Sequence, residues 1–261
     1  MMRVFKSEWL KIRRPAMILG GAGTMIGFAV LAIVLTLNRL SSTGGGLEGA
    51  LGAARVAASD GFAALMGATT TFIGIVALAI CAVSVGMEYA NGTLRNLLVR
   101  QPRRLFLLVG KLLALGSFIA LAVVLAYGAA LATALVLTPS HGISTTAWFS
   151  TAGVQSLFAT AGNLLLATLA WGAIGAGLAL VLRSTAMAIA GGLAYILVVE
   201  TLLTATWSGG AQWLPGQLIK VIAGGGAPSV SYASALGLVG LYLLVAGVVV
   251  STLFVRRDVA A

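Results

Sequence analysis

The chain has 261 residues, of which 60% are hydrophobic and 8% are charged, and its net charge is +10. A soluble domain is about 25% charged, and a soluble chain of this length cannot bury so large an apolar fraction. These values argue against a soluble enzyme, a disordered protein and a coiled coil, and they favour a polytopic membrane protein. The single cysteine, Cys81, excludes a disulfide framework and a thiolate metal site.

Apolar runs recur along the whole chain and predict six membrane-spanning helices. The predicted spans are at about residues 16–37, 61–86, 105–137, 154–182, 186–206 and 233–255. Each span needs about 20 residues, so six spans take up roughly 120 to 140 residues and leave no stretch for a soluble catalytic domain. We therefore expect residues 1–261 to form a single all-α transmembrane domain.

Lysine and arginine are unevenly distributed between the two sides of these spans. Thirteen of the sixteen fall on the side of the termini: Arg3, Lys6, Lys11, Arg13, Arg14, Arg95, Arg100, Arg103, Arg104, Lys111, Arg183, Arg256 and Arg257. The other three, Arg39, Arg55 and Lys220, fall on the opposite side. Because cytoplasmic loops are enriched in Lys and Arg, we expect both termini to be cytoplasmic. This distribution explains the basic charge by membrane orientation, so no nucleic-acid partner is expected.

Residues 1–15 show the pattern of an amphipathic helix. Phe5, Trp9, Ile12 and Ala16 recur at helical spacing, and basic residues occupy the other faces. Such a helix suits the headgroup boundary of a membrane. The alternative is a basic anchor without helical order.

The segment at about 87–104, between the second and third spans, predicts a short cytoplasmic helix. Asn91-Gly92 is a turn signal and Thr93 suits the cap of a following helix. Leu94, Leu97 and Leu98 make an apolar stripe that leaves Arg95 to one side. The proposed cytoplasmic interface also includes Arg100, Arg103, Arg104 and Lys111. Such a helix would pass force from a cytoplasmic partner into the membrane, whereas the alternative is a basic loop that only fixes topology.

The sequence lacks the residues that several other functions need. Gly110-Lys111 is the only Gly-Lys pair and is not part of a phosphate-binding loop, and one histidine with one cysteine makes no metal site. We therefore expect no cofactor in this chain. Glu200 is a lone carboxylate late in the fifth span. It is either an outer gate or pathway group, or a residue that reaches the interface.

Two further patterns concern helix packing and the last outer loop. Gly23–Gly27 and Ala173–Gly177 are small-xxx-small motifs, which we interpret first as contacts within the chain and second as dimer contacts. Residues 213–223 suit a short re-entrant or interfacial helix.

The segment from Glu88 to Lys111 resembles the permease subunit of type-two ABC transporters, which are mostly bacterial exporters. The resemblance is carried by Glu88, Gly92-Thr93-Leu94-Arg95, Pro102-Arg103-Arg104 and Gly110-Lys111. Ser7-Glu8-Trp9-Leu10-Lys11 also resembles the amphipathic N-terminus of that family.

This resemblance implies a transport subunit that is not itself an enzyme, in the cytoplasmic membrane of a bacterium. It would pair with a second permease, identical or paralogous, and with a separate cytoplasmic subunit that binds ATP and Mg. The coupling helix would lie within 88–101. The implied coupling residues are Glu88, Asn91, Gly92, Thr93, Leu94, Arg95, Leu97 and Leu98.

Substrate would pass between the two permeases along the first, second and fifth spans. Because few charges line these spans, we expect an amphipathic or lipophilic cargo, such as a drug, a peptide antibiotic or a lipid-like compound. The competing interpretation is a non-transporting six-span scaffold or regulator without an ATPase partner. An ion channel needs a ring of charges or carbonyls along a pore, for which the sequence offers no clear candidate.

Overall fold

The computed structural model describes residues 2–13, 15–42, 47–67, 69–93, 104–207 and 209–256, with the side chains of all but 2–4, 16, 47 and 104. These residues form helices joined by short turns, and no strand occurs among them. In chain order, the longer helices are α1 (Met2–Ile12), α3 (Gly23–Ser42), α4 (Leu47–Ala57), α6 (Thr69–Ala90), α8 (Arg104–Ser140), α9 (Thr151–Leu182), α10 (Thr185–Ala194), α12 (Pro215–Ala223) and α13 (Tyr232–Arg256). The shorter ones are α2 (Pro15–Met17), η1 (Ile18–Ala22), α5 (Gly61–Met66), η2 (Thr146–Phe149), η3 (Tyr195–Val199), α11 (Glu200–Thr206) and η4 (Gly210–Gln212).

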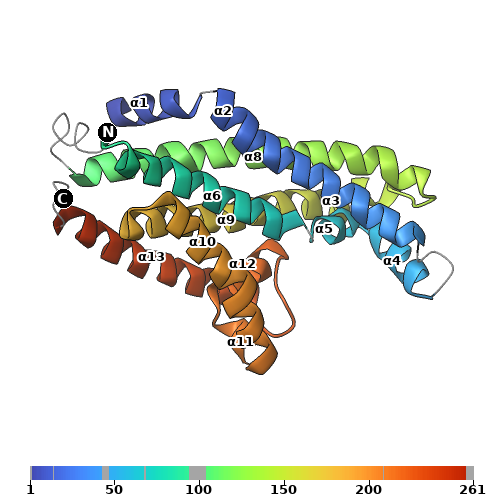
Figure 1. Ribbon diagram of the computed structural model, residues 1–261. Coiled ribbons are helices and arrows are strands. Elements are labelled where there is room, and N and C mark those ends of the chain that lie inside the picture. The colour runs from blue at the N-terminus through green and yellow to red at the C-terminus, as the bar shows by residue number, and fades with distance from the viewer. Residues whose placement is uncertain are drawn as a thin grey trace.

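Six helical stretches are long and apolar enough to cross a membrane, which confirms the predicted all-α, six-span fold. They are Ile18–Ser42, Thr69–Ala90, Leu105–Ser140, Thr151–Leu182, Thr185–Thr206 and Tyr232–Arg256. Helix α1 and the C-terminal end of α13 lie at the same end of the bundle (Figure 1). At the opposite end lie α4 and the ends of α3 and α8.

The second span starts later than its apolar run predicts. Residues 61–66 form the separate helix α5, and the span begins at Thr69. The indole N–H of Trp148 donates to the carbonyl of Val56 at 2.8 Å, and a Cβ on Gly61 would collide with that same carbonyl. Phe62 packs against Trp148 and, edge to face, against Tyr127. The apolar residues of α5 are thus buried in a protein corner, and hydropathy alone does not distinguish that environment from lipid.

Close packing of α6 against α9 forms the centre of the bundle. A Cβ on Gly74 would overlap the Trp171 ring, and one on Gly175 would overlap the backbone of Leu78. By contrast, Gly27 has no atom from another segment within 4 Å of its Cβ position. The prediction that Gly23–Gly27 packs within the chain is therefore wrong for the described residues. The Ala173–Gly177 motif does pack within the chain, because Gly175 lies inside it and a Cβ on Gly177 would lie 3.8 Å from the Val250 side chain.

Helix α1 lies within the segment 1–15, for which the sequence predicts an amphipathic helix, and it runs along α8 (Figure 1). Ile12 is buried, and the rings of Phe5 and Trp9 stack with centroids 6.0 Å apart and pack against the core. The apolar stripe of α1 therefore contacts protein. Its position at the headgroup boundary of a membrane stays a prediction.

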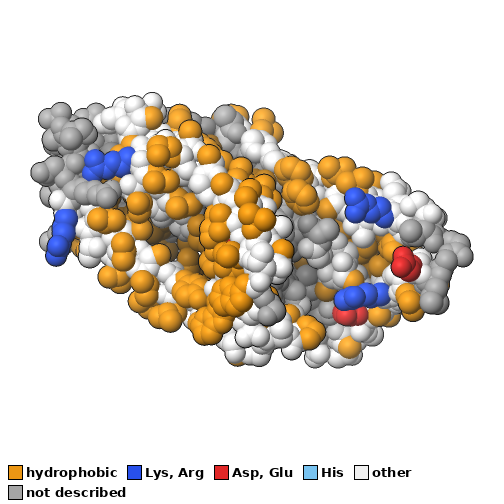
Figure 2. Space-filling model, turned by 60° about the horizontal axis from the view of Figure 1, so that its bottom comes forward, with side chains coloured by type: hydrophobic (Ala, Val, Ile, Leu, Met, Phe, Trp, Pro, Cys, Tyr) orange, Lys and Arg blue, Asp and Glu red, His pale blue; other side chains and the backbone are white. Residues whose placement is uncertain are grey.

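The outer surface is apolar in its middle and charged at its ends. On the face shown in Figure 2, hydrophobic side chains cover the central part, and the visible lysine, arginine and acidic side chains gather toward the two ends. The sixth span is the most exposed, with 11% of its most apolar window buried, compared with 56% for the second. The sixth span therefore faces lipid or another subunit, whereas the second lies largely inside the bundle.

Candidate functional site

Four charged side chains from three helices form one cluster, which we call the charge cluster: Glu8, Lys11, Glu88 and Lys111. The Lys111 ammonium lies 2.8 Å from a carboxylate oxygen of Glu8 and 2.8 Å from one of Glu88. Lys11 lies 3.0 Å from Glu88 and also pairs with Glu8. Each cation therefore contacts both anions, and each anion contacts both cations.

The charge cluster is largely shielded from solvent. The side chains of Glu8 and Lys111 are 4% and 7% exposed, whereas that of Lys11 is 40% exposed. Burying a charge is costly unless it is paired and hydrogen-bonded, and here two positive charges balance two negative ones. Because of this mutual pairing, the removal of one charge leaves its partners with an uncompensated buried charge.

The electrostatics of the two α1 residues follow from this geometry. Burial opposes ionisation of Glu8, but the nearby charges of Lys111 and Lys11, with their hydrogen bonds, hold the pKa of Glu8 below its ordinary value. Burial likewise opposes the charged form of Lys11, but its hydrogen bonds and charge interactions with Glu8 and Glu88 raise its pKa above the ordinary value. Both residues are thus charged at neutral pH.

The position of each residue along its helix explains why these four side chains meet. Glu8 and Lys11 are three residues apart on α1 and therefore share a face. Glu88 lies in the last turn of α6, where the helix dipole disfavours an anion, so the two lysines offset that cost. Lys111 lies about two turns into α8, beside which α1 packs.

Of the predicted coupling and interface residues, the structure brings Glu88 and Lys111 together. Gly92 follows the end of α6 and has a φ of +63°, which fits the turn predicted at Asn91-Gly92. The Thr93 hydroxyl donates a hydrogen bond of 3.4 Å to the backbone carbonyl of Glu88. Arg104 begins α8, but its side chain lies outside the described residues. Outside them altogether are Leu94, Arg95, Leu97, Leu98, Arg100 and Arg103. The coupling helix therefore stays a prediction.

Sequence reasoning missed the part that Glu8 and Lys11 play in this site. The sequence pattern places Glu8 and Lys11 in the amphipathic N-terminal stretch and counts Lys11 among the basic residues of one side, but it gives neither residue a charged partner. A usable signal was the rarity of acids, because the whole chain contains six Asp and Glu residues. An acidic residue among apolar neighbours, on the side of a membrane protein that is rich in Lys and Arg, is expected to pair with one of those basic residues.

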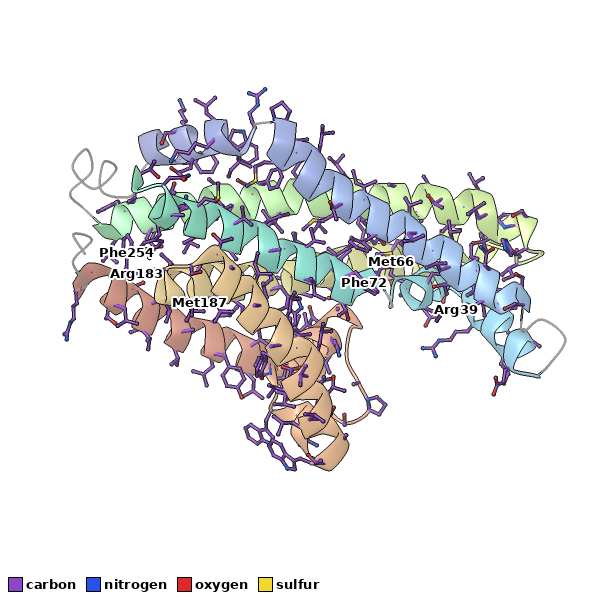
Figure 3. All side chains as sticks on the ribbon, in the orientation of Figure 1. Arg39, Met66, Phe72, Arg183, Met187 and Phe254 are labelled. Atoms are coloured by element: carbon purple, nitrogen blue, oxygen red, sulfur yellow. The ribbon has the colours of Figure 1, made fainter. Side chains whose placement is uncertain are left out.

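The turn between α9 and α10 meets the same end of the bundle. Arg183 caps α9 in the left-handed conformation, with a φ of 52°, and its guanidinium carbon lies 6.0 Å from the centre of the Tyr89 ring. A Cβ on Gly86 would overlap Thr185, so this turn lies directly against α6. Figure 3 shows Arg183 near Phe254 at this end of the bundle and Arg39 toward the other end. This agrees with the prediction that Arg183 and Arg39 lie on opposite sides of the spans.

Glu200 is fully buried rather than at the interface, which rules out the interface interpretation. One carboxylate oxygen accepts the backbone N–H of Gly216 at 2.6 Å, and the other accepts the side-chain amide of Gln217 at 3.3 Å. Glu200 thus caps the first turn of α12, whose first residue is Pro215. The predicted helix near 213–223 corresponds to α12, while a gate role for Glu200 stays a prediction.

An apolar cavity of about 430 Å³ lies next to this capped helix. Its walls come from α6, α9, α10, η3, α12 and α13, and it is lined by aromatic and aliphatic side chains that include Trp171, Tyr195 and Tyr242. Such a lining suits the hydrocarbon part of a ligand. Among the described residues, no group of three His, Cys, Asp or Glu is placed to hold a metal ion.

Residues 4–199 match the model of the ABC-2 family of transporter proteins. The chain belongs to this family. The match contains all four members of the charge cluster and ends one residue before Glu200. The comparison with curated proteins gave no match. Together with the six apolar helices, membership of the ABC-2 family makes this chain a multi-pass transmembrane subunit of an ABC transporter.

Proposed function

We propose that this chain is the permease of an ATP-driven exporter for amphipathic or lipophilic compounds, which works as a dimer powered by a separate ATP-binding subunit. The ABC-2 family supports the transport class. The charge cluster is the observation that carries the proposal. It ties α1 to the end of α6 and the start of α8, which flank the predicted coupling segment.

The mechanism we propose follows from this linkage. Movement imposed by an ATPase on the segment between α6 and α8 would reach Glu88 and Lys111 first. Because Glu8 pairs with Lys111 and Lys11 pairs with Glu88, α1 would move with the two spans. The charge cluster would thus make three helices respond as one unit in the change between inward-open and outward-open states.

The nature of the cargo is inferred from the apolar cavity and the exposed spans. The cavity is lined almost entirely by carbon-rich side chains, and it lies beside the fifth and sixth spans, whose faces are largely free within one chain. A second permease would cover part of these faces. A compound with a hydrocarbon moiety fits this environment better than an ion or a sugar.

The first test is purification of the tagged chain in mild detergent from its native membrane, followed by measurement of vanadate-sensitive ATP hydrolysis. We expect an ATP-binding protein to co-purify. Glu88→Gln should lower hydrolysis while the chain stays in the membrane, and Glu48→Gln, which changes an exposed acid near the opposite end, should not. A chain without ATPase, under conditions that keep a control transporter intact, would favour the non-transporting scaffold.

Direction is tested with membrane vesicles and fluorescent lipophilic probes. ATP-dependent accumulation in inverted vesicles, lost in Glu88→Gln, would support export. ATP-dependent uptake into right-side-out vesicles would instead indicate import and overturn that part of the proposal.

A further inference from the structure

A second, polar cavity of about 610 Å³ lies toward the end of the bundle opposite the termini. It is enclosed by the end of α3, by α4 and α5, by the start of α6, by α9 and by the end of α12. Its volume is within the range of about 300–1,000 Å³ that is usual for small-molecule sites. The Gly224–Gly226 turn, which uses positive φ at Gly225 and Gly226, closes one side.

Two basic side chains from separate helices line this polar cavity, Arg55 of α4 and Lys220 of α12. The chain has sixteen basic residues, and the span pattern assigns three to this side, of which these are two. Neither forms an ion pair with any described residue. Because basic residues are disfavoured on the outer side, their convergence on one cavity calls for a negatively charged partner.

The rest of the lining combines hydrogen-bonding and apolar groups. Asn163 accepts a hydrogen bond from the Tyr232 hydroxyl at 2.8 Å through its carbonyl oxygen, which leaves its amide nitrogen as a donor. Leu40, Val56 and Leu164 supply apolar surface. Asp60 is the one acid in the lining, so the charge there is net positive. These features suit a ligand with an anionic group and an attached apolar part.

We propose that the polar cavity binds the anionic headgroup of a membrane amphiphile, a phosphate or a carboxylate, held by Arg55 and Lys220. An outer-leaflet lipid and an exported amphiphile present the same chemistry to this site. The inference rests on the cavity and its charges, and therefore does not depend on the proposed export function.

The test uses the full chain in phosphatidylcholine vesicles with a phosphatidylglycerol probe that carries a diazirine on its headgroup. After irradiation, the labelled residues are mapped by mass spectrometry. We expect label within 52–71, 160–164 or 220–226. The label should fall by at least about tenfold in R55A/K220A, because loss of even one of the two charge-assisted hydrogen bonds has an effect of that size.

Three comparisons make this result specific. Arg39→Ala removes the third basic residue of this side, which does not line the cavity, and should keep the label. The double variant R55K/K220R exchanges the two basic side chains, conserves both charges, and should also keep it. A diazirine-bearing phosphatidylcholine should label these segments weakly. Equal labelling by both probes, or unchanged labelling of R55A/K220A, would overturn the proposal.

Two further measurements complete the test: one asks which part of the ligand is bound, and the other guards against a variant that does not fold. Loss of the label in excess inorganic phosphate would support the proposal and show that the anionic group alone suffices for binding, whereas persistence of the label would support a membrane amphiphile that is held by its apolar part as well. If R55A/K220A fails to fold, Lys220→Gln alone, at an exposed position, serves as the variant. Unchanged labelling in that variant would then count against the proposal.

Discussion

Lys111 of α8 donates a hydrogen bond of 2.8 Å to Glu8 of α1, although 103 positions separate them in the sequence. Both side chains are almost completely buried; Glu8 also pairs with Lys11, and Lys111 also pairs with Glu88. Together with the apolar stripe of α1, this pair joins α1 to the spans. It is therefore the most direct target for testing whether the charge cluster matters.

Replacement of Lys111 by methionine should strongly destabilise the protein. The change leaves Glu8 and Glu88 with Lys11 as their one described cation, and breaking a buried pair in this way costs about 3–5 kcal/mol. Titration with sodium dodecyl sulfate in mixed micelles measures the free energy of unfolding.

The matched control for this change is Lys220→Met, at an exposed lysine. The double variant E8Q/K111M should recover part of the loss, because one pair, Lys11 with Glu88, stays balanced. An equal effect of Lys111→Met and Lys220→Met would contradict the importance of the charge cluster.

Docking of α1 should depend on pH at both extremes. The pKa of Glu8 is lowered by its partners, so its contribution is present above the unfolded value of 4.5 and is lost as pH falls through the folded value. The pKa of Lys11 is raised, so its contribution is present below 10.5 and is lost as pH rises through the folded value. We expect α1 to stay docked between these limits.

Hydrogen exchange of the amides of residues 5–12, corrected for the intrinsic effect of pH, measures this docking. Protection should decrease on the acidic side in the native chain, and this acidic change should be absent in Glu8→Gln. The same acidic loss of protection in the native chain and in Glu8→Gln would show that Glu8 does not hold α1.

Gly216→Ala should weaken the packing of α12 against Glu200. A Cβ at Gly216 would overlap the Glu200 carboxylate that accepts its N–H, and overpacking typically costs about 1–3 kcal/mol. The control is Gly237→Ala in α13, where the Cβ meets nothing within 4 Å and helix propensity favours alanine. Thermal unfolding of the two variants gives the comparison. A drop in the Gly237→Ala midpoint as large as that of Gly216→Ala would count against this role of Glu200.

Gly27→Leu should weaken permease dimers without disturbing the fold of one chain. Within the described residues, no other segment lies near Gly27, and glycine on a transmembrane face permits close helix approach. The expected result is less cross-linked dimer with unchanged thermal unfolding. Gly128→Leu, at an equally open position of α8, is the control. Equal dimer yield from the native chain and Gly27→Leu would exclude this face as the interface.

The sequence by itself determined the class of protein and the number of spans. Hydropathy suffices for this because a helix in a bilayer satisfies its own backbone hydrogen bonds and exposes apolar side chains to lipid. A long apolar run therefore predicts a span whatever its neighbours are. The resemblance around Glu88 also led to the transporter family that the comparison found.

Only the tertiary structure decided which groups meet. The pairing of Glu8 with Lys111, the corner formed by α5, the capping of α12 by Glu200 and the convergence of Arg55 with Lys220 join segments far apart in the chain. Hydropathy reports that a helix is apolar, but it does not report how the helix is rotated or which helix packs beside it. Charged groups at a bundle's ends and glycines at close approaches take their roles from these neighbours.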